Sequence, residues 1–166
     1  MRSAFRSSVK FWGARGYVSN SNSKGFTLPF LDAVLAEVDS ASVMSRVEFT
    51  SPHTWLLAEL RRRCPGATLG LLAADREPWI GLDLYVDMLG NQARALGVNV
   101  VHVNHRDVDD AVVDQFHDRG FLVHAADTPD GSAAHRVALA GVDQLSTSDV
   151  RSTVAVLRDG TMSRPA

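Results

Sequence analysis

Short apolar runs alternate with stretches of helical periodicity along most of this chain. The apolar runs predict strands over 43–49, 68–73, 98–103, 121–125 and 144–146. Between them, apolar residues recur at helical spacing over 52–63, 82–96, 108–119 and from about 127 to 140, with further helices before the first strand, over 27–38, and after the last, to 157. A strand followed by a helix, repeated in this way, predicts parallel strands joined by right-handed crossovers.

The ends of the helices are marked by polar residues and glycines. A side-chain oxygen just before a helix can accept a hydrogen bond from its first turn, and a glycine just after it allows the left-handed backbone that stops it. The expected caps are Thr27, Ser51, Asp107, Asp127 and Ser148, and the expected stops are Gly97, Gly120 and Gly141.

Five parallel βα units are fewer than a closed barrel requires. A (β/α)₈ barrel has eight units and typically about 250 residues, whereas this chain has 166 residues. Five strands can form an open doubly wound sheet or part of a barrel. The fold class is α/β in either case, and the unpaired strand edges of a partial (β/α)₈ barrel would favour self-association.

The ends of the chain differ from its body in composition and charge. Residues 1–26 are basic and serine-rich. Five positively charged side chains precede the first acidic residue, Asp32. Because the net charge of the whole chain is −2, the rest of the chain has a net charge of −7. We expect 1–26 to be a leader, disordered or an amphipathic helix, 27–158 to be the folded domain and 159–166 a tail. The acidic body argues against a nucleic-acid partner, and no apolar run reaches the roughly 18 residues of a membrane span.

Two weaker indications come from residue usage. The single cysteine, Cys64, excludes an intramolecular disulfide and a thiolate metal cluster. Of the 17 Lys and Arg residues, only Lys10 and Lys24 are lysines. This excess of arginine suggests a GC-rich gene and therefore a bacterial protein. We expect the protein to be cytoplasmic.

Two segments near the C-terminus carry a family resemblance. VHAADTPD, from Val123, and GVDQLSTSD, from Gly141, resemble the last two strands of the glycerophosphodiester phosphodiesterase family. The similarity extends back to Val47 and, through a Thr-Leu helix, to Thr27. It implies the C-terminal half of a (β/α)₈ barrel. Pro52 and Ala126 depart from the family, because they stand where members carry aromatic residues.

The resemblance also implies a reaction, the metal-dependent hydrolysis of glycerophosphodiesters to glycerol 3-phosphate and an alcohol. The family uses a histidine pair and a divalent cation, Mg²⁺ or Ca²⁺, held by carboxylates, and these motifs belong to the first half of its barrel. The nearest match here, Ala14-Arg15-Gly16, has alanine in place of histidine. We therefore expect no catalytic residue, no metal ligand and no activity from this chain alone. A small phosphodiester would bind if the barrel were completed; the alternative is a non-catalytic interaction module.

The expected ends of the strands carry the remaining candidate binding residues. Parallel strands end at one face, where such barrels do their chemistry. The polar residues expected at this face are Ser51, Asn104, His105, His124, Asp127, Thr147 and Asp149, and all of them except His105 are the substrate-facing candidates. The spacing of His102, His105 and Asp107 matches no known metal-ligand pattern. A rival interpretation is an unrelated doubly wound domain that binds a phosphate-bearing ligand. The sequence contains no G-x-G-x-x-G or phosphate-loop motif to support it.

Overall fold

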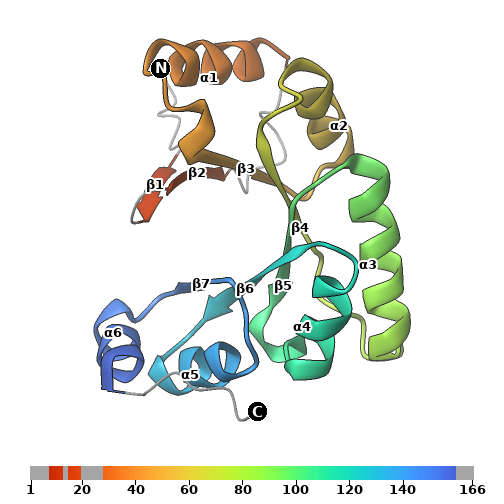
Figure 1. Ribbon diagram of the computed structural model, residues 1–166, viewed down its shortest axis with the longest axis vertical. Coiled ribbons are helices and arrows are strands. Elements are labelled where there is room, and N and C mark those ends of the chain that lie inside the picture. The colour runs from red at the N-terminus through yellow and green to blue at the C-terminus, as the bar shows by residue number, and fades with distance from the viewer. Residues whose placement is uncertain (1–7, 13–14, 20–27, 160–166) are drawn as a thin grey trace, which may run out of the picture. The chain divides into compact units, whose positions relative to one another are not determined.

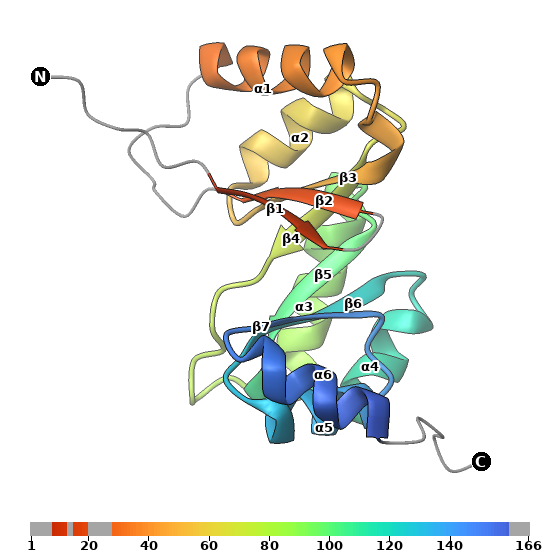
Figure 2. The same ribbon diagram turned by 90° about the vertical axis from the view of Figure 1, so that its left-hand side faces the viewer.

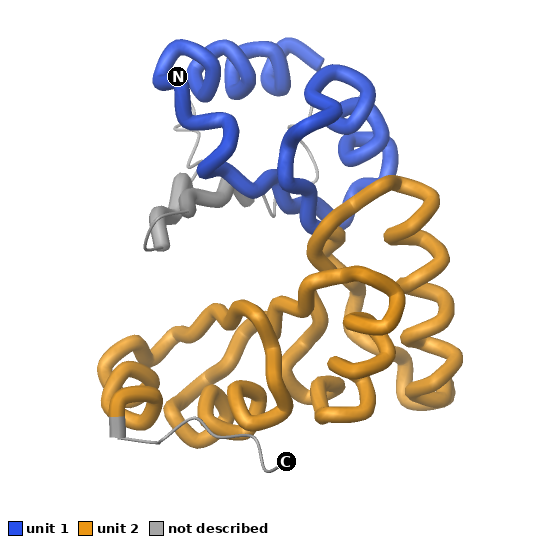
Figure 3. The backbone as a smooth tube through the Cα atoms, in the orientation of Figure 1, with its two compact units in different colours: residues 1–70 blue, residues 71–166 orange. Residues whose placement is uncertain are grey.

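The computed structural model describes residues 8–12, 15–19 and 28–159 of the chain. It divides into two compact units, Met1–Gly70 and Leu71–Ala166 (Figure 3). Each unit is described by itself below.

The first unit is built of two helices and the early strands (Figure 1). The strands are β1 (Ser8–Trp12), β2 (Arg15–Ser19), β3 (Val47–Ser51) and the first part of β4 (Thr68–Leu72), and the helices are α1 (Leu28–Ser40), the 3₁₀ turn η1 (Met44–Arg46) and α2 (Thr54–Arg63). All five residues of β3 are buried, as expected for a strand covered on both faces.

The second unit continues the strand and helix alternation. After β4 come α3 (Leu82–Leu96), β5 (Val100–Asn104), the 3₁₀ turn η2 (His105–Asp107), α4 (Asp110–His117), β6 (Leu122–Thr128), α5 (Gly131–Leu139), β7 (Gln144–Thr147) and α6 (Val150–Asp159). Helices α3, α4 and α5 pack against strands β5, β6 and β7, and α5 and α6 lie side by side (Figures 1 and 2).

The strands are hydrogen-bonded in the order in which they occur in the chain. In the second unit, β5 pairs with β6 and β6 with β7 in parallel, which places His102 beside His124 and His124 beside Gln144. Parallel strands in sequence order with a helix after each are the pattern of a (β/α)₈ barrel. The prediction of five parallel strands, β3 to β7, in a partial barrel is confirmed.

Two strands lie in the region for which the sequence predicts a leader. β1 pairs with β2 antiparallel, and β2 pairs with β3 in parallel. The helical alternative is wrong for residues 8–12, because pairing with other segments determines the local structure there and composition does not reveal it. Residues 1–7, 13–14 and 20–27, which include the predicted cap Thr27, and residues 160–166 of the tail lie outside the described residues.

β-branched residues on β5 and β6 form the core of the second unit. Val100, Val101, Val103, Val123 and Ala125 are fully buried. Their helix partners include Val86, Val113, Phe116, Ala134 and Val137, which are also fully buried. Burial of this apolar surface, at about 25 cal/mol per Å², is the main force that holds helices and strands together.

Aspartates cap three helices, but they are not the residues that the sequence predicts. Asp109 Oδ1 accepts from Val112 N at 2.9 Å and Asp130 Oδ1 from Ala133 N at 2.8 Å. The predicted caps Asp107 and Asp127 are instead in η2 and in β6. After β5 the turn η2 precedes α4, so the cap is Asp109 and not Asp107. β6 extends to Thr128 before α5 begins, so the cap is Asp130 and not Asp127.

Two further cap predictions are also wrong. Asp149, not Ser148, caps α6, because its Oδ1 accepts from Ser152 N at 3.1 Å. Ser51 precedes α2 by more than one residue, and its hydroxyl accepts from His53 N. The predicted glycine stops are confirmed, since Gly97, Gly120 and Gly141 have φ of 62°, 83° and 92°.

A carboxylate ties the amino ends of two strands to a helix. Asp143, just before β7, accepts from Val123 N of β6 at 2.8 Å through Oδ2. The same oxygen lies 2.9 Å from His117 Nε2 at the end of α4. One side chain therefore joins β6, β7 and α4 at the amino ends of the strands.

Gly131 allows α5 and α6 to approach closely, which gives a stability prediction. Its N–H donates to Ser152 Oγ at 2.8 Å, and an added Cβ would lie 2.9 Å from both Ser152 O and Ser152 Oγ. We expect Gly131→Ala to lower the free energy of unfolding by about 1 to 3 kcal/mol through overpacking. Urea denaturation measures this. Gly66→Ala is the matched control, because nothing lies within 4 Å of its Cβ position; equal losses in the two variants would contradict the explanation.

Candidate functional site

The candidate site lies at the carboxyl ends of β4 to β7 in the second unit. In a parallel sheet these ends share one edge, and connections that leave them form the binding face. The connections here are residues 73–81, 105–109, 129–130 and 148–149. Three of the predicted residues, Asn104, Asp127 and Thr147, lie at or near these strand ends.

Asn104, at the end of β5, joins two connections. Its Nδ2 donates to Asp75 Oδ1 at 2.9 Å, and its Oδ1 accepts from Arg106 N at 3.0 Å. The side-chain amide thus holds the connection after β4 and starts the turn after β5. This is a positioning role, and a substrate contact by Asn104 stays a prediction.

An ion pair fixes the connection between β4 and α3. Arg76 Nε donates to Asp107 Oδ1 at 2.9 Å, and Arg76 Nη1 donates to Ile80 O at 2.6 Å. The Tyr85 hydroxyl donates to Ala74 O at 2.7 Å, and burial, with the nearby carboxylates of Asp107 and Asp75, raises the pKa of Tyr85 to about 12. Asp107 therefore serves as the counterion of Arg76, which explains why it is not a helix cap.

Positive charge gathers after β5. Arg136 of α5 donates through Nη1 to Val108 O at 2.6 Å and through Nη2 to His105 O at 2.5 Å. Burial, then Arg136 and Arg106, lower the pKa of His105, so its imidazole is neutral at pH 7. Arg106 is exposed, and within the described part of the chain its guanidinium has no hydrogen-bond or ion-pair partner.

Sequence reasoning missed both arginines. Arg106 follows a strand end by two residues, which is a usable signal, but Arg136 lies in the middle of a helix. Only the packing of α5 against η2 brings Arg136 to this edge. His105, by contrast, was among the polar residues expected at the strand ends, and its backbone carbonyl accepts a hydrogen bond from Arg136.

Asp127 interrupts the regular pairing of β6. Its φ is 58°, a left-handed conformation that few residues other than glycine adopt. The β6–β7 register shifts between Ala125 and Thr128, and Asp127 N donates to Ser146 Oγ at 3.1 Å. The Asp127 carboxylate is exposed, and its charge offsets a small part of the lowering of the His105 pKa that burial and the arginines cause.

His124 lies deeper in the unit than the other candidates. Its ring stacks on His102 with centroids 4.2 Å apart, and its Nδ1 lies 3.1 Å from Gln144 Oε1. Both histidines are more than nine-tenths buried. The row of His102, His124 and Gln144 therefore forms a polar layer beneath the strand ends, and a role for His124 in contact with substrate stays a prediction.

Thr147 and Asp149 both contribute to the start of α6. Thr147 Oγ1 lies 3.0 Å from Thr153 Oγ1 and accepts from Asp149 N at 3.1 Å. Hydrogen bonds from Ser152 lower the pKa of Asp149. Both residues therefore have structural contacts at the start of α6, and contact of either one with a substrate stays a prediction.

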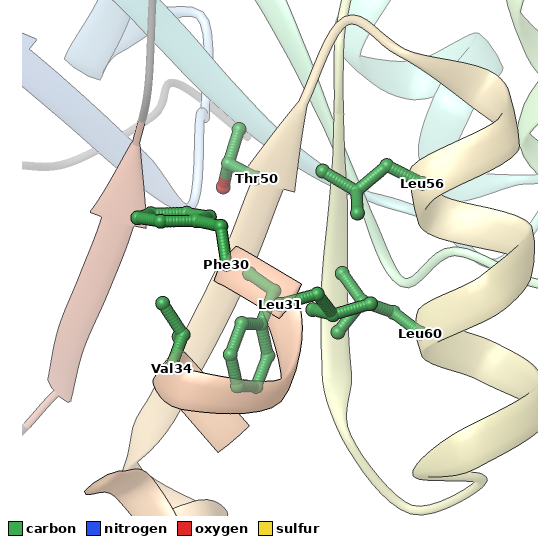
Figure 4. A pocket seen from close by; sticks show the side chains of 7 residues that line it. Phe30, Leu31, Val34, Thr50, Leu56 and Leu60 are labelled. Atoms are coloured by element: carbon green, nitrogen blue, oxygen red, sulfur yellow. The ribbon is translucent and has the colours of Figure 1, made fainter. Parts of the chain in front are cut away.

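Ser51 belongs to the first unit, which also contains an apolar hollow that Ser51 does not line. Its side chain is buried, and its Oγ accepts from His53 N at 3.0 Å. The hollow is lined by Phe30, Leu31, Val34, Phe49, Thr50, Leu56 and Leu60 from α1, β3 and α2 (Figure 4). Its one polar side chain, Thr50, donates to Glu48 Oε1 at 3.0 Å. The residues that line this hollow include no positively charged side chain that could bind a phosphodiester.

The carboxylates at the strand ends do not fit a divalent cation. Asp107 pairs with Arg76, Asp75 with the amide of Asn104, and Asp149 with backbone N–H groups. Across residues 8–12, 15–19 and 28–159, no three His, Cys, Asp or Glu side chains are grouped so as to hold a metal ion. Among the helices in these ranges, none is both long and apolar enough to cross a membrane.

Comparison with known proteins finds no matching family model and no matching curated sequence. Solved structures do match. A protein of Silicibacter pomeroyi assigned as a glycerophosphoryl diester phosphodiesterase is 26% identical, with a TM-score of 0.68 over 78% of this chain and 43% of its own. A glycerophosphodiester phosphodiesterase assigned in Galdieria sulphuraria has a TM-score of 0.69 at 17% identity, over 86% of this chain and 56% of its own.

A third structure carries a ligand. A phosphodiesterase of Oleispira antarctica, in complex with the product sn-glycerol-3-phosphate, has a TM-score of 0.56 at 16% identity, over 76% of this chain and 49% of its own. The matched structures have the α/β fold described above, and this chain spans about half their length. The chain is thus a structural relative of the glycerophosphodiester phosphodiesterases.

Proposed function

We propose that this chain supplies the phosphodiester-binding half of a glycerophosphodiester phosphodiesterase barrel and does not hydrolyse the diester by itself. The observation that supports the proposal is the exposed Arg106 guanidinium at the carboxyl end of β5, beside the neutral imidazole of His105 and the anchored Arg136. Arginine suits phosphate because its planar group donates several hydrogen bonds to phosphate oxygens.

The neighbouring groups suit the rest of a glycerophosphodiester. Asp127 can accept hydrogen bonds from the glycerol hydroxyls, because its carboxylate is exposed at the adjacent strand end. The neutral His105 adds a hydrogen-bonding group without further charge. Asn104, Asp107 and Arg76 hold the connections, so the binding groups are fixed before a ligand arrives.

The chemical step needs groups that we do not assign to this chain. A divalent cation neutralises a phosphodiester and assists its hydrolysis. We propose that the cation and the acid and base histidines come from a complementary half of the barrel. In support, the carboxylates of Asp75, Asp107 and Asp149 already have structural partners.

The first test is turnover. Purified protein incubated with glycerophosphocholine and Mg²⁺ or Ca²⁺ should release no more glycerol 3-phosphate than heat-denatured protein, because the loss of positioned acid–base groups alone costs a factor of roughly 10² to 10⁴. Phosphorus NMR follows substrate and product together. Metal-dependent release above the denatured control would refute the proposal of inactivity.

The second test is binding. We expect Arg106→Ala to weaken the binding of glycerol 3-phosphate about tenfold, because a hydrogen bond to a charged group contributes roughly 1.5 kcal/mol. Calorimetry or ligand-observed NMR measures the change. Arg94→Ala is the matched control, since Arg94 is exposed in the last turn of α3. Equal affinities for Arg106→Ala and the unchanged chain would remove the assigned phosphate site.

A second candidate function, a non-catalytic interaction module, is favoured by one observation. β7 is the last strand in the sheet order, and all four of its residues are partly exposed, whereas all five of β3 are buried. An edge strand of this kind can pair with a strand of another chain.

Sedimentation velocity over a dilution series tests this alternative. Self-association through β7 predicts a weight-average mass that rises with concentration. It also predicts that Leu145→Lys suppresses the rise, because a charge on an edge strand opposes further pairing. Arg151→Lys on α6 is the control. A monomer at every concentration would exclude self-association as the role of this edge.

A further inference from the structure

The connection between β4 and α3 holds an exposed tryptophan in a fixed place. Ile80 N donates to Glu77 O at 2.9 Å, which closes a β-turn with Pro78 at its second position and Trp79 at its third. Trp79 is 80% exposed. Tryptophan is costly to expose, so an indole presented on a closed turn requires an explanation.

The turn is anchored from both sides. Arg76 bonds to Ile80 O across the turn and to Asp107 of η2. Before the turn, Ala73 N donates to His102 O at 3.0 Å, Asp75 accepts from Asn104, and Tyr85 bonds to Ala74 O. The order of this segment thus comes from backbone and polar contacts, and the Trp79 indole is left free for contact with another molecule.

The residues next to Trp79 in the sequence include exposed carboxylates. Arg76 is paired with Asp107, so it does not offset its neighbours. Glu77, two residues before Trp79, is exposed and has no ion-pair partner within the part of the chain that the structure describes. Asp83, in the first turn of α3, is also exposed, and its carboxylate accepts a hydrogen bond from the neutral amide of Gln115 at 3.4 Å. An anion, including an anionic lipid surface, is repelled here.

An aromatic face beside uncompensated carboxylates selects a particular ligand chemistry. A weakly hydrated organic cation is attracted to the face of an indole, and tryptophan is the best side chain for this contact. Quaternary ammonium groups are the ligands that such aromatic sites bind. We propose that the Glu77–Ile80 turn is a binding site for a quaternary ammonium cation, with Trp79 as the contact surface and Glu77 as the counter-charge.

The site is separate from the phosphate-binding residues. It lies on the β4–α3 connection, whereas Arg106 and His105 follow β5. It therefore requires neither hydrolysis nor a phosphate, and goes beyond the function proposed above. The cation can be free in solution or the choline end of a lipid at a surface, and the experiment separates these sources.

NMR titration of the intact chain with choline tests the proposal. The indole N–H signals of the three tryptophans are resolved and assigned by substitution. We expect the Trp79 signal to shift and saturate. The uncharged isostere of choline, in which a tert-butyl group replaces the trimethylammonium, should bind roughly two- to fivefold more weakly, because an exposed cation–π contact contributes about 0.5 to 1 kcal/mol. Equal binding of the isostere would show a plain apolar surface and overturn the proposal.

Variants locate the contact. Trp79→Leu should abolish the saturable binding, and Glu77→Gln should weaken it roughly two- to fivefold while the fold is retained, since both side chains are exposed. Trp55→Leu is the matched control, because Trp55 is 48% exposed on α2. Binding that survives Trp79→Leu, or that fails in Trp55→Leu alone, would overturn the assignment.

Vesicles distinguish the source of the cation. If the ligand is a lipid head group, phosphatidylcholine vesicles should retain the chain in co-sedimentation, and Trp79→Leu should release it. If the ligand is soluble, choline and glycerophosphocholine should shift the Trp79 signal to the same extent, with no retention by vesicles. Either outcome supports the proposal. Equal retention by phosphatidylglycerol vesicles would show membrane insertion without cation recognition and would overturn it, as would the absence of any saturable shift.

Discussion

Parallel pairing of β5, β6 and β7 is the constraint on which the second unit depends. The pairing brings Val100, Val101, Val103 and Val123 into a layer that is closed to water and covered by helices. Because all three strands run the same way, every connection that follows a strand leaves at the same edge. The positions of Arg106 and Asp127 follow from this geometry.

Most polar groups at that edge stabilise the connections and do not face solvent freely. Arg76 pairs with Asp107, and the side-chain amide of Asn104 bonds to Asp75. Asp149 and Asp130 cap helices. The few exposed side chains are held on a framework whose own hydrogen bonds are satisfied. A binding group on such a framework loses little freedom when a ligand arrives, which favours affinity.

Much of this fold could be predicted from the sequence, because periodicity reports burial. The apolar runs located all five βα strands, and Gly97, Gly120 and Gly141 ended helices as expected, since a left-handed residue has few substitutes. β6 extends beyond its predicted end because its bulge is stabilised by pairing with β7, a contact distant in sequence. β1 and β2 were missed for a similar reason, since pairing with β3 is not encoded by local composition.

The site was less predictable than the fold. The structure places Asn104, His105 and Asp127 at the ends of β5 and β6, and contact of the candidates Asn104 and Asp127 with a substrate stays a prediction. Sequence position alone did not distinguish the buried His124 from an exposed residue, and it gave no sign that α5 would deliver Arg136 to η2. Side-chain direction and helix packing decide these cases, and both depend on tertiary structure.

The carboxylate of Asp143 has a consequence for evolution. It fastens β6, β7 and α4 at the end of the strands opposite to the connections that carry Arg106 and Trp79. Cohesion and recognition are therefore assigned to opposite ends of the same strands. Insertions or substitutions in the connections that carry Arg106 and Trp79 can accumulate while the contacts of Asp143 are preserved. The scaffold can therefore acquire new ligand preferences through drift without first losing stability.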